Sequence, residues 1–335
     1  MKVLHVNDVA RIGSALVRQA RSSGLDWSLY DTARVDPRWS PRSRALRRAL
    51  RGAAWEAGLA RRALFADLLD VHGATVTAHT RWLRRPYVLH LHGTDIRVRR
   101  YEPAYTALVE RAVREARDVY YTTPDLAKHV LDLAPEATLQ PVIVDVREIP
   151  VATGRGGQRP RILFPSRWDA AKGGANQLEL LAALRDEYGY EIELEGLDWG
   201  ENAAVVARDF GVVLRPRMSH RDYGRWLGSG TLAVGQMTGY MGISELEAIA
   251  TGTTTVMALD SRSYDGTHPT TRDVPVLGGL ADDEQLVEVA LNGVRQGLGG
   301  KRVSDGRAWV AANHSPALAV ERLQERFMKL NLGQI

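Results

Sequence analysis

Residues 161–174 read RILFPSRWDAAKGG, a short apolar run, a polar turn and the beginning of a helical pattern. The run predicts a strand over 161–165, and the pattern after the turn predicts a helix over about 174–187. The turn brings Arg167 and Lys172 to the point where that helix begins. Because helix N-termini and cationic side chains both attract anions, the turn predicts a diphosphate site. An ordinary surface loop is the alternative interpretation.

A second stretch repeats this arrangement at residues 234–252, VGQMTGYMGISELEAIATG. Gly239 and Gly242 let the backbone approach a ligand closely, and the N–H groups of Gly242 and Ile243 can receive phosphate oxygens. Glu247 follows about one helical turn later, where a carboxylate can accept the hydroxyls of a ribose. The alternative for Glu247 is a solvated helical glutamate, which is what we expect of the neighbouring Glu245.

A third stretch, LHLHGTDIR at 89–97, places polar residues at the end of a predicted strand. His92, before Gly93 and Asp95, can hydrogen-bond a sugar hydroxyl or transfer a proton, although a structural role is the alternative. His90 and His92 alternate along the strand, but no third ligand follows at a spacing suited to a metal. We therefore expect no metal site.

Short apolar runs alternate with helical patterns along the whole chain, which indicates an α/β fold with parallel sheets. The predicted strands are 2–6, 68–72, 87–91, 118–121, 141–144, 161–165, 190–194, 212–215, 231–234 and 253–258. The predicted helices are 13–23, 42–65, 103–116, 124–132, 174–187, 201–209, 221–228 and 243–251. We expect an N-terminal domain over 1–150, a glycine-rich linker over 151–160, a C-terminal domain over 161–314 and a final helix within 315–335 that can pack back on the first domain.

Composition narrows the class of protein. With 44% hydrophobic and 25% charged residues among 335, the chain is an average globular protein long enough for two domains. It has no cysteine, which excludes disulfides, thiolate zinc sites and a cysteine nucleophile. No stretch approaches the roughly 20 apolar residues of a membrane span. We expect a cytoplasmic protein.

The positive charge is concentrated in the first half of the chain. Residues 1–150 carry 24 basic and 17 acidic side chains, whereas the remainder carry 20 and 23. Much of the excess lies in 38–62, where eight arginines interleave with Trp39, Leu46, Leu50, Trp55 and Leu59. This pattern is typical of a basic amphipathic helix that can lie on the anionic inner face of a membrane or attract an anionic acceptor. A solvated helical face is the alternative, and no nucleic-acid-binding motif accompanies the charge.

In their order along the chain, the three stretches resemble glycosyltransferase family 4, whose members are retaining enzymes of GT-B fold. The resemblance covers almost the whole chain. His92, Gly93 and Asp95 look like the family's HGxD motif. The family's G-R-x-x-x-x-K-G loop is matched, apart from its first glycine, by Ser166, Arg167, Lys172 and Gly173. Its E-G-F-G-L-x-x-L-E-A-M-A-x-G segment is similar to 239–252. Weaker marks are DVH at 70–72 and GRAWVAANHS at 306–315.

This resemblance implies two Rossmann-like domains that face a central cleft. It also implies metal-independent transfer of a hexosyl sugar, without a cofactor, from a UDP- or GDP-linked donor to a glycan, lipid-linked or small-molecule acceptor. The residues that it implies at the donor are Arg167 and Lys172 on the diphosphate, the Gly242 and Ile243 amides beside them, Glu247 on the ribose, Gly239, and Gly13 near phosphate or acceptor. His92 and Asp95 are the implied catalytic residues, with His92 facing the sugar.

The chain departs from the family pattern at Gly239, where the first glutamate of a pair normally contacts the donor sugar. Two alternatives therefore remain. One is a non-catalytic nucleotide-sugar-binding or regulatory protein of the same fold. The other is a GT-B epimerase of nucleotide sugars, which needs acid and base groups around the sugar, and His92 is the one candidate for them.

Overall fold

The computed structural model describes residues 1–32, 41–152, 159–303 and 305–334. The chain forms two compact units, Met1–Pro141 with Pro316–Ile335 (unit 1) and Val142–Ser315 (unit 2). Residues 142–150, which we expected in the first domain, thus belong to unit 2. The backbone N–H of Val144 donates to the carbonyl of His314, and Arg307 donates to the carbonyl of Ile149 at 3.1 Å, which ties this segment to unit 2. Of the expected linker, residues 153–158 lie outside the described residues.

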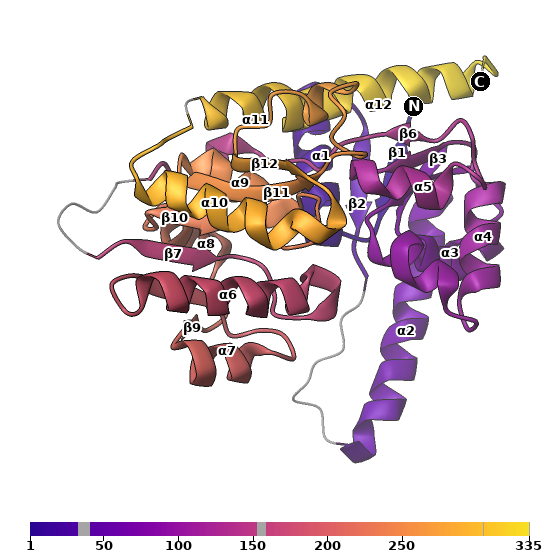
Figure 1. Ribbon diagram of the computed structural model, residues 1–335. Helices are drawn as coiled ribbons and strands as arrows, with labels where there is room; N and C mark the ends of the chain where they lie inside the picture. The colour runs from indigo at the N-terminus through magenta and orange to yellow at the C-terminus, as the bar shows by residue number, and fades with distance from the viewer. Residues whose placement is uncertain (33–40, 153–158, 304, 335) are drawn as a thin grey trace. The chain divides into compact units, whose positions relative to one another are not determined.

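Unit 1 is built on a parallel six-stranded sheet (Figure 1). Its strands are β1 (Val3–Val6), β2 (Trp27–Tyr30), β3 (Leu68–His72), β4 (Tyr87–Leu91), β5 (Val119–Tyr121) and β6 (Thr138–Leu139), in the order β2-β1-β3-β4-β5-β6. Its helices are α1 (Ile12–Ser22), α2 (Pro41–Ala63), α3 (Thr77–Thr80), α4 (Thr106–Glu115), α5 (Ala127–Val130) and α12 (Pro316–Asn331). The strand order reverses between β1 and β3, and ligands of such sheets bind beyond the carboxyl ends of the strands at that point.

The two faces of this sheet differ in chemistry. On one face, leucines and valines of β1, β3 and β4 form an apolar core with Leu59 of α2 and Val109 of α4. The opposite face carries buried polar side chains, His5, Asp70, His72 and His90. Aromatic rings surround that polar group, because Phe327 of α12 packs 5.5 Å from Trp27 and 6.4 Å from Tyr120, measured between ring centroids.

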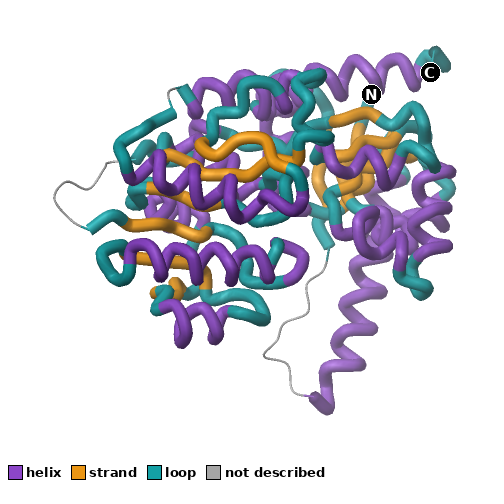
Figure 2. The backbone as a smooth tube through the Cα atoms, viewed as in Figure 1, coloured by secondary structure: helices purple, strands orange, loops and turns teal. Residues whose placement is uncertain are grey.

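Helix α2 is anchored at its C-terminal half. Leu59 is buried, and Trp55 stacks on Tyr30 with ring centroids 5.5 Å apart. Residues 45–51, in contrast, are all exposed, including Leu46 and Leu50. Within unit 1, this part of the helix extends away from the sheet (Figure 2).

Unit 2 is a second parallel six-stranded sheet, in the order β12-β11-β10-β7-β8-β9. Its strands are β7 (Arg161–Phe164), β8 (Glu193–Leu197), β9 (Val213–Arg215), β10 (Leu232–Val234), β11 (Thr254–Asp260) and β12 (Leu277–Ala281). Its helices are α6 (Gly174–Tyr188), α7 (Ala203–Phe210), α8 (His220–Leu227), α9 (Ile243–Thr251), α10 (Leu286–Leu298) and α11 (Gly306–His314). This is the strand order of the doubly wound nucleotide-binding folds, with the reversal between β7 and β10.

The predicted α/β class is confirmed, but several elements differ from the sequence prediction. The strand expected at 141–144 is wrong, because this buried segment pairs with no strand and the last strand of the sheet is β6. The pattern also missed β2, β12, α10 and α11. Glycines explain two of these omissions. Gly278 and Gly279 weaken the strand pattern of β12, and Gly293 and Gly297 weaken the helical pattern of α10. Across the described residues, the helices are all too short or too polar to cross a membrane.

Candidate functional site

The two stretches singled out in the second half of the sequence meet at the reversal point of the unit 2 sheet. β7 and β10 are paired neighbours, with Ile162 opposite Leu232. The turn after β7 carries Arg167 and Lys172, and the turn after β10 leads through Gln236 to the first residue of α9. Because both turns leave the carboxyl ends of adjacent parallel strands, they form one site where this class of sheet binds its ligands.

The two turns are packed directly on each other. Gly173 has a φ of 76°, and a β-carbon on it would stand 2.1 Å from the carbonyl oxygen of Met237, so only glycine fits there. The Met237 N–H donates to the carbonyl of Lys172 at 3.1 Å, and Nδ2 of Asn176 donates to the carbonyl of Met237 at 3.2 Å. These backbone contacts fix the base of the Lys172 side chain.

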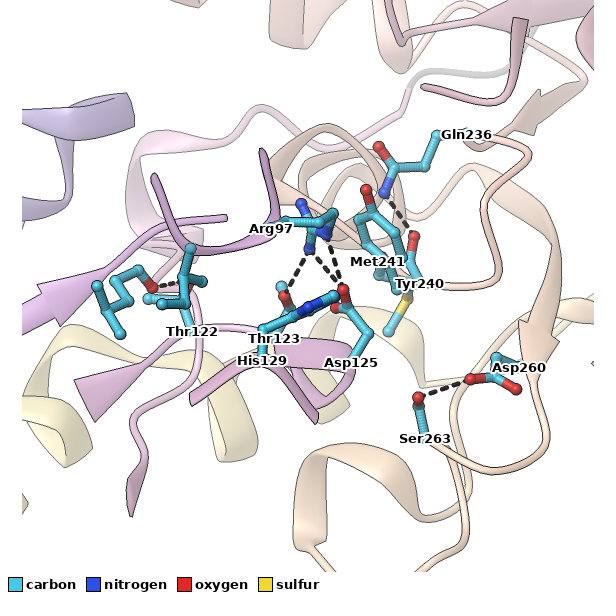
Figure 3. Close-up of polar contacts among 12 residues, drawn as sticks. Arg97, Thr122, Thr123, Asp125, His129, Gln236, Tyr240, Met241, Asp260 and Ser263 are labelled. Carbon is cyan, nitrogen blue, oxygen red and sulfur yellow. Dashed lines mark hydrogen bonds and ion pairs between the residues drawn. The ribbon is translucent and has the colours of Figure 1, made fainter. Parts of the chain in front are cut away.

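Lys172 places its ammonium group at the N-terminus of α9. Its Nζ donates to Oε1 of Gln236 at 2.5 Å, and Nε2 of Gln236 donates in turn to the carbonyl of Tyr240 at 2.6 Å (Figure 3). The same Nζ lies 3.9 Å from the position that a β-carbon on Gly242 would take. A lysine charge and the positive end of a helix dipole therefore coincide, which is the arrangement that binds phosphate groups.

Glu245 organises this helix N-terminus. It is 1% exposed, and its carboxylate accepts the backbone N–H groups of Gln236 at 3.1 Å and Gly242 at 2.8 Å. The expectation of a solvated Glu245 is thus wrong, and the Gly242 amide, which we expected at the phosphate, is bonded to Glu245 instead. Ile243 and Ser244 follow in the first helical turn, where N–H groups have no intrahelical acceptor. An acidic residue three positions after a helix N-cap is a capping signature that could have predicted this role.

Arg167 is held by two neighbours. Its Nε lies 3.2 Å from Oδ2 of Asp169, and its guanidinium stacks 5.1 Å from the ring centroid of Trp199. The preceding Ser166 is buried and accepts a hydrogen bond from Gln177 of α6 at 3.0 Å. The guanidinium is thus positioned beside the turn, but a carboxylate already shares its charge.

Glu247 lies on the buried side of α9, two residues beyond Glu245. Its Oε1 is 2.7 Å from Nε2 of His220, the first residue of α8, and the carboxylate is about a tenth exposed. A carboxylate has lone pairs for more than one donor, so contact with His220 is compatible with binding ribose hydroxyls. His220 could not be predicted from the sequence, because it lies 27 positions before Glu247 and belongs to no motif.

The turn around Gly239 is shaped for glycine. Gly239 has a φ of 78°, and a β-carbon there would stand 3.0 Å from Cβ of Asp260 at the end of β11. The carboxylate of Asp260 is itself engaged, with Oδ2 accepting from Ser263 at 2.7 Å and Oδ1 from Arg262 at 2.9 Å (Figure 3). The carboxylate of Asp260 is therefore no simple substitute for the glutamate that the family has at the position of Gly239.

In unit 1, His92 follows β4 directly and is half-buried. Its Nε2 lies 3.0 Å from Nδ1 of His72, and desolvation lowers the pKa of His92 to about 3. His92 is therefore neutral at neutral pH. His72, at the end of β3, is a partner that the sequence analysis did not connect with His92.

Asp95 and Arg97 connect the turns beyond the strands of unit 1. Asp95 is buried and accepts the N–H groups of Ala74 at 3.0 Å and Ile96 at 3.1 Å, and burial raises its pKa. Arg97 forms an ion pair with Asp125 at 2.7 Å (Figure 3). In this structure the Asp95 carboxylate supports the backbone after β3, and the expected catalytic role of Asp95 stays a prediction.

Gly13 lies in the first turn of α1, after β1. A β-carbon on it would stand 3.1 Å from the carbonyl oxygen of Asn7, so the turn folds back closely on the helix. Three non-glycine residues of this turn have positive φ, Asn7 at 77°, Ala10 at 49° and Arg11 at 65°. Such strain gathers at functional sites, which is consistent with the expected place of Gly13 near a ligand.

No family model matches the sequence, and no curated protein matches it either. Solved structures do match. Sucrose-phosphate synthase from Thermosynechococcus elongatus has 13% identity and a TM-score of 0.72, covering 99% of this chain and 100% of its own. The chain has the GT-B fold. HepE from Anabaena in complex with UDP-glucose has 13% identity and a TM-score of 0.67, with 98% and 100% covered. The lipopolysaccharide outer core galactosyltransferase WaaB has 11% identity and a TM-score of 0.62, with both chains covered fully.

Proposed function

We propose that this GT-B protein is a glycosyltransferase that takes a hexosyl sugar from a nucleoside diphosphate sugar, as family 4 enzymes do. The observation that carries the proposal is the ammonium group of Lys172 at the N-terminus of α9, on the reversal point of the unit 2 sheet. Support comes from three GT-B neighbours, which are by name a synthase, a galactosyltransferase and a complex with UDP-glucose.

The proposed chemistry follows from the leaving group. Breaking the bond between sugar and diphosphate develops negative charge on the phosphate oxygens, and preorganised cations and amides stabilise that charge. Lys172, Arg167 and the first turn of α9 supply these groups. We propose that Glu247 binds the ribose, that His92 contacts the transferred sugar, and that the sugar keeps its original anomeric configuration, as in family 4. We propose that the reaction needs no metal.

A thermal-shift panel of nucleotides tests the donor. We expect UDP or GDP, and their sugar conjugates, to raise the melting temperature, because a ligand held 100-fold above its Kd stabilises a protein by about 2.7 kcal/mol. We expect the shift to persist in EDTA and to be absent with uridine, which lacks the diphosphate. If no nucleoside diphosphate shifts the melting temperature while the protein unfolds cooperatively, the proposed donor site is wrong.

Gly239 motivates a second candidate, a nucleotide-sugar-binding protein without catalysis. The turn has no acid at the position that contacts the sugar in the family, and Asp260 beside it is occupied. Slow release of free glucose from UDP-glucose, followed by mass spectrometry, separates the two, since a binding protein releases none. An epimer of the nucleotide sugar in the same sample, resolved by chromatography because its mass equals that of the substrate, would instead favour an epimerase.

Helix α2 favours an acceptor at a membrane, reached by peripheral association with the cytoplasmic face. Leu46 and Leu50 are 66% and 63% exposed one turn apart, beside the exposed Arg47, Arg48 and Arg51. An exposed apolar stripe bordered by arginines binds anionic lipid through both burial and charge.

Flotation with vesicles containing phosphatidylglycerol tests this association. We expect the protein to float with anionic vesicles and not with pure phosphatidylcholine, and added salt to weaken binding. Replacing Arg47, Arg48 and Arg51 together by glutamine should abolish flotation, whereas Arg208→Gln on α7, an equally exposed arginine of unit 2, should not. Equal flotation of the triple variant would contradict the proposal.

A further inference from the structure

A buried polar cluster occupies one face of the unit 1 sheet. Strand pairing sets His5 of β1 opposite Asp70 of β3, and His72 of β3 opposite His90 of β4. Because alternate residues of a strand share a face, His92 lies on this face too, just beyond the end of β4. The first four side chains are at most 1% exposed, so bulk solvent does not reach them. Four imidazoles and a carboxylate in a domain core are costly unless they serve one another or a ligand.

The contacts form one continuous chain. Nδ1 of His90 lies 2.6 Å from Oδ1 of Asp70, and Nδ1 of His5 lies 3.2 Å from Oδ2 of Asp70. The same Nδ1 of His5 is 3.1 Å from Nε2 of His72, whose Nδ1 is 3.0 Å from Nε2 of His92. The rings of His72 and His92 are nearly parallel, at 13°, with centroids 5.2 Å apart. The chain therefore begins at a fully buried carboxylate and ends at a half-buried histidine.

The position of the Asp70 carboxylate determines which imidazole nitrogens carry protons. A neutral imidazole has one N–H and one acceptor nitrogen. Nδ1 of His5 must carry its proton, because an acceptor nitrogen 3.2 Å from a carboxylate oxygen would be repelled. Nε2 of His72 then accepts from His5, so the proton of His72 lies on Nδ1. That proton points at Nε2 of His92, which must accept it.

We propose that Asp70, through His5 and His72, holds His92 in the neutral tautomer that carries its proton on Nδ1. His92 then presents a hydrogen-bond donor to a ligand at the carboxyl end of β4 and has no free basic nitrogen there. If His92 faces the donor sugar, which rests on the proposed function, it contacts a sugar oxygen as a donor and does not act as a general base. Asp70, His5 and His72 are positioning residues in this arrangement.

Burial supports the neutral state on which the tautomer depends. Desolvation lowers the pKa of His5 to about 4 and the pKa of His72 well below its usual value, despite the nearby carboxylate. Burial alone would raise the pKa of Asp70, but the imidazoles around it hold that pKa below the usual range. At neutral pH, His5 and His72 are thus neutral beside an ionised Asp70.

A metal ion is the alternative way to satisfy the same atoms. His5, Asp70 and His72 offer ligand atoms within 4.8 Å of one another. Structural zinc, however, takes four protein ligands, and the described part of the chain gathers three here. Hydrogen bonds between His90 and Asp70 and between His5 and His72 already engage these side chains without a metal ion, which is why we favour the hydrogen-bonded chain.

Long-range proton–nitrogen NMR spectra of protein with 15N-labelled histidine test the tautomer directly, because they show which ring nitrogen carries the proton. The His92 signals are identified as those absent from His92→Gln. We expect His92 in the wild-type protein to carry its proton on Nδ1. A proton on Nε2 of His92 in the wild-type protein would overturn the proposal without any variant.

Two substitutions at His72 separate the effect of its hydrogen bond to His92 from the effect of its size. His72→Phe keeps an aromatic ring but has no hydrogen-bond donor. We therefore expect His92 in this variant to carry its proton on Nε2, as free histidine prefers. His72→Asn places an amide N–H near the position of Nδ1, so we expect the Nδ1 proton of His92 to be retained. His79→Gln, at an exposed histidine paired with Glu56, is the matched control. A folded His72→Phe protein with an unchanged His92 tautomer would disprove the role of His72.

Elemental analysis of the same samples distinguishes the metal. One equivalent of zinc that survives dialysis and is absent from His72→Phe would replace the His5–His72 hydrogen bond and overturn the proposal. None of these measurements requires a nucleotide. Failure of every nucleoside diphosphate to bind would therefore refute the proposed function and leave the tautomer result intact. We expect His72→Phe to bind the nucleoside diphosphate that the wild-type protein binds, with unchanged affinity.

Discussion

Lys172→Ala should weaken binding of UDP or GDP roughly 10- to 100-fold, because a hydrogen bond to a charged group contributes about 1.5–3 kcal/mol and each 1.4 kcal/mol is a factor of ten. The side chain that is removed carries the ammonium at the N-terminus of α9, whereas the backbone carbonyl that receives Met237 remains. The turn should therefore keep its conformation. Titration calorimetry with the nucleotide measures the effect.

Lys301→Ala is the matched control, since Lys301 also donates to a glutamine oxygen, Oε1 of Gln296 at 2.9 Å, but lies on the surface far along the chain from both turns. Arg167→Ala should have a smaller effect than Lys172→Ala, because Asp169 already shares the charge of Arg167. Wild-type affinity in both Arg167→Ala and Lys172→Ala would mean that the diphosphate binds elsewhere.

The stability of the protein should fall steeply between pH 7 and pH 4. The pKa of His5 is about 4 in the folded protein and near 6.5 when it is unfolded, so the unfolded chain binds more protons in this range and stability falls as the pH falls. At about 1.4 kcal/mol per pKa unit, His5 alone costs on the order of 3 kcal/mol by pH 4. This is a large share of the roughly 5–15 kcal/mol of a typical domain.

Urea unfolding at several pH values measures this loss. The titratable groups around His5 are Asp70, His72, His90 and Asp8. Asp70 has a lowered pKa, so its own contribution is lost only below about pH 4, where free carboxylates titrate. We expect His5→Phe to make the profile between pH 7 and 4 shallower, with His72 and His92 responsible for the slope that remains. We expect His79→Gln, at an exposed histidine, to leave the profile unchanged. A flat wild-type profile in this range would mean that the histidines are not buried in the neutral form.

Local signals were sufficient for the frame of the fold. The strand, turn and helix at 161–174 and the glycine-bearing turn before α9 both lie where the sequence placed them, because apolar runs and helix starts are local features. The sequence missed β12 because glycines occupy its centre, and it placed a strand at 141–144 because buried extended segments and strands share the same apolar pattern.

The site could be predicted from the sequence only where its residues are close together along the chain. Arg167 and Lys172 share one turn, so their neighbourhood is a local fact. The contacts of Gln236 with Lys172 and of His220 with Glu247 join residues 64 and 27 positions apart, and only tertiary structure reveals them. The histidine cluster was not predicted for the same reason, since His5 and Asp70 are 65 positions apart and only the strand register places them side by side.

Unit 1 is assembled from two segments of the chain, one before unit 2 and one after it. Helix α12 supplies Phe327 against Trp27, and Arg326, whose guanidinium forms a bidentate pair with Asp118. During synthesis these last residues leave the ribosome only after all of unit 2. The first 141 residues must therefore wait, without the helix that packs on Trp27 and pairs with Asp118, until unit 2 has been made.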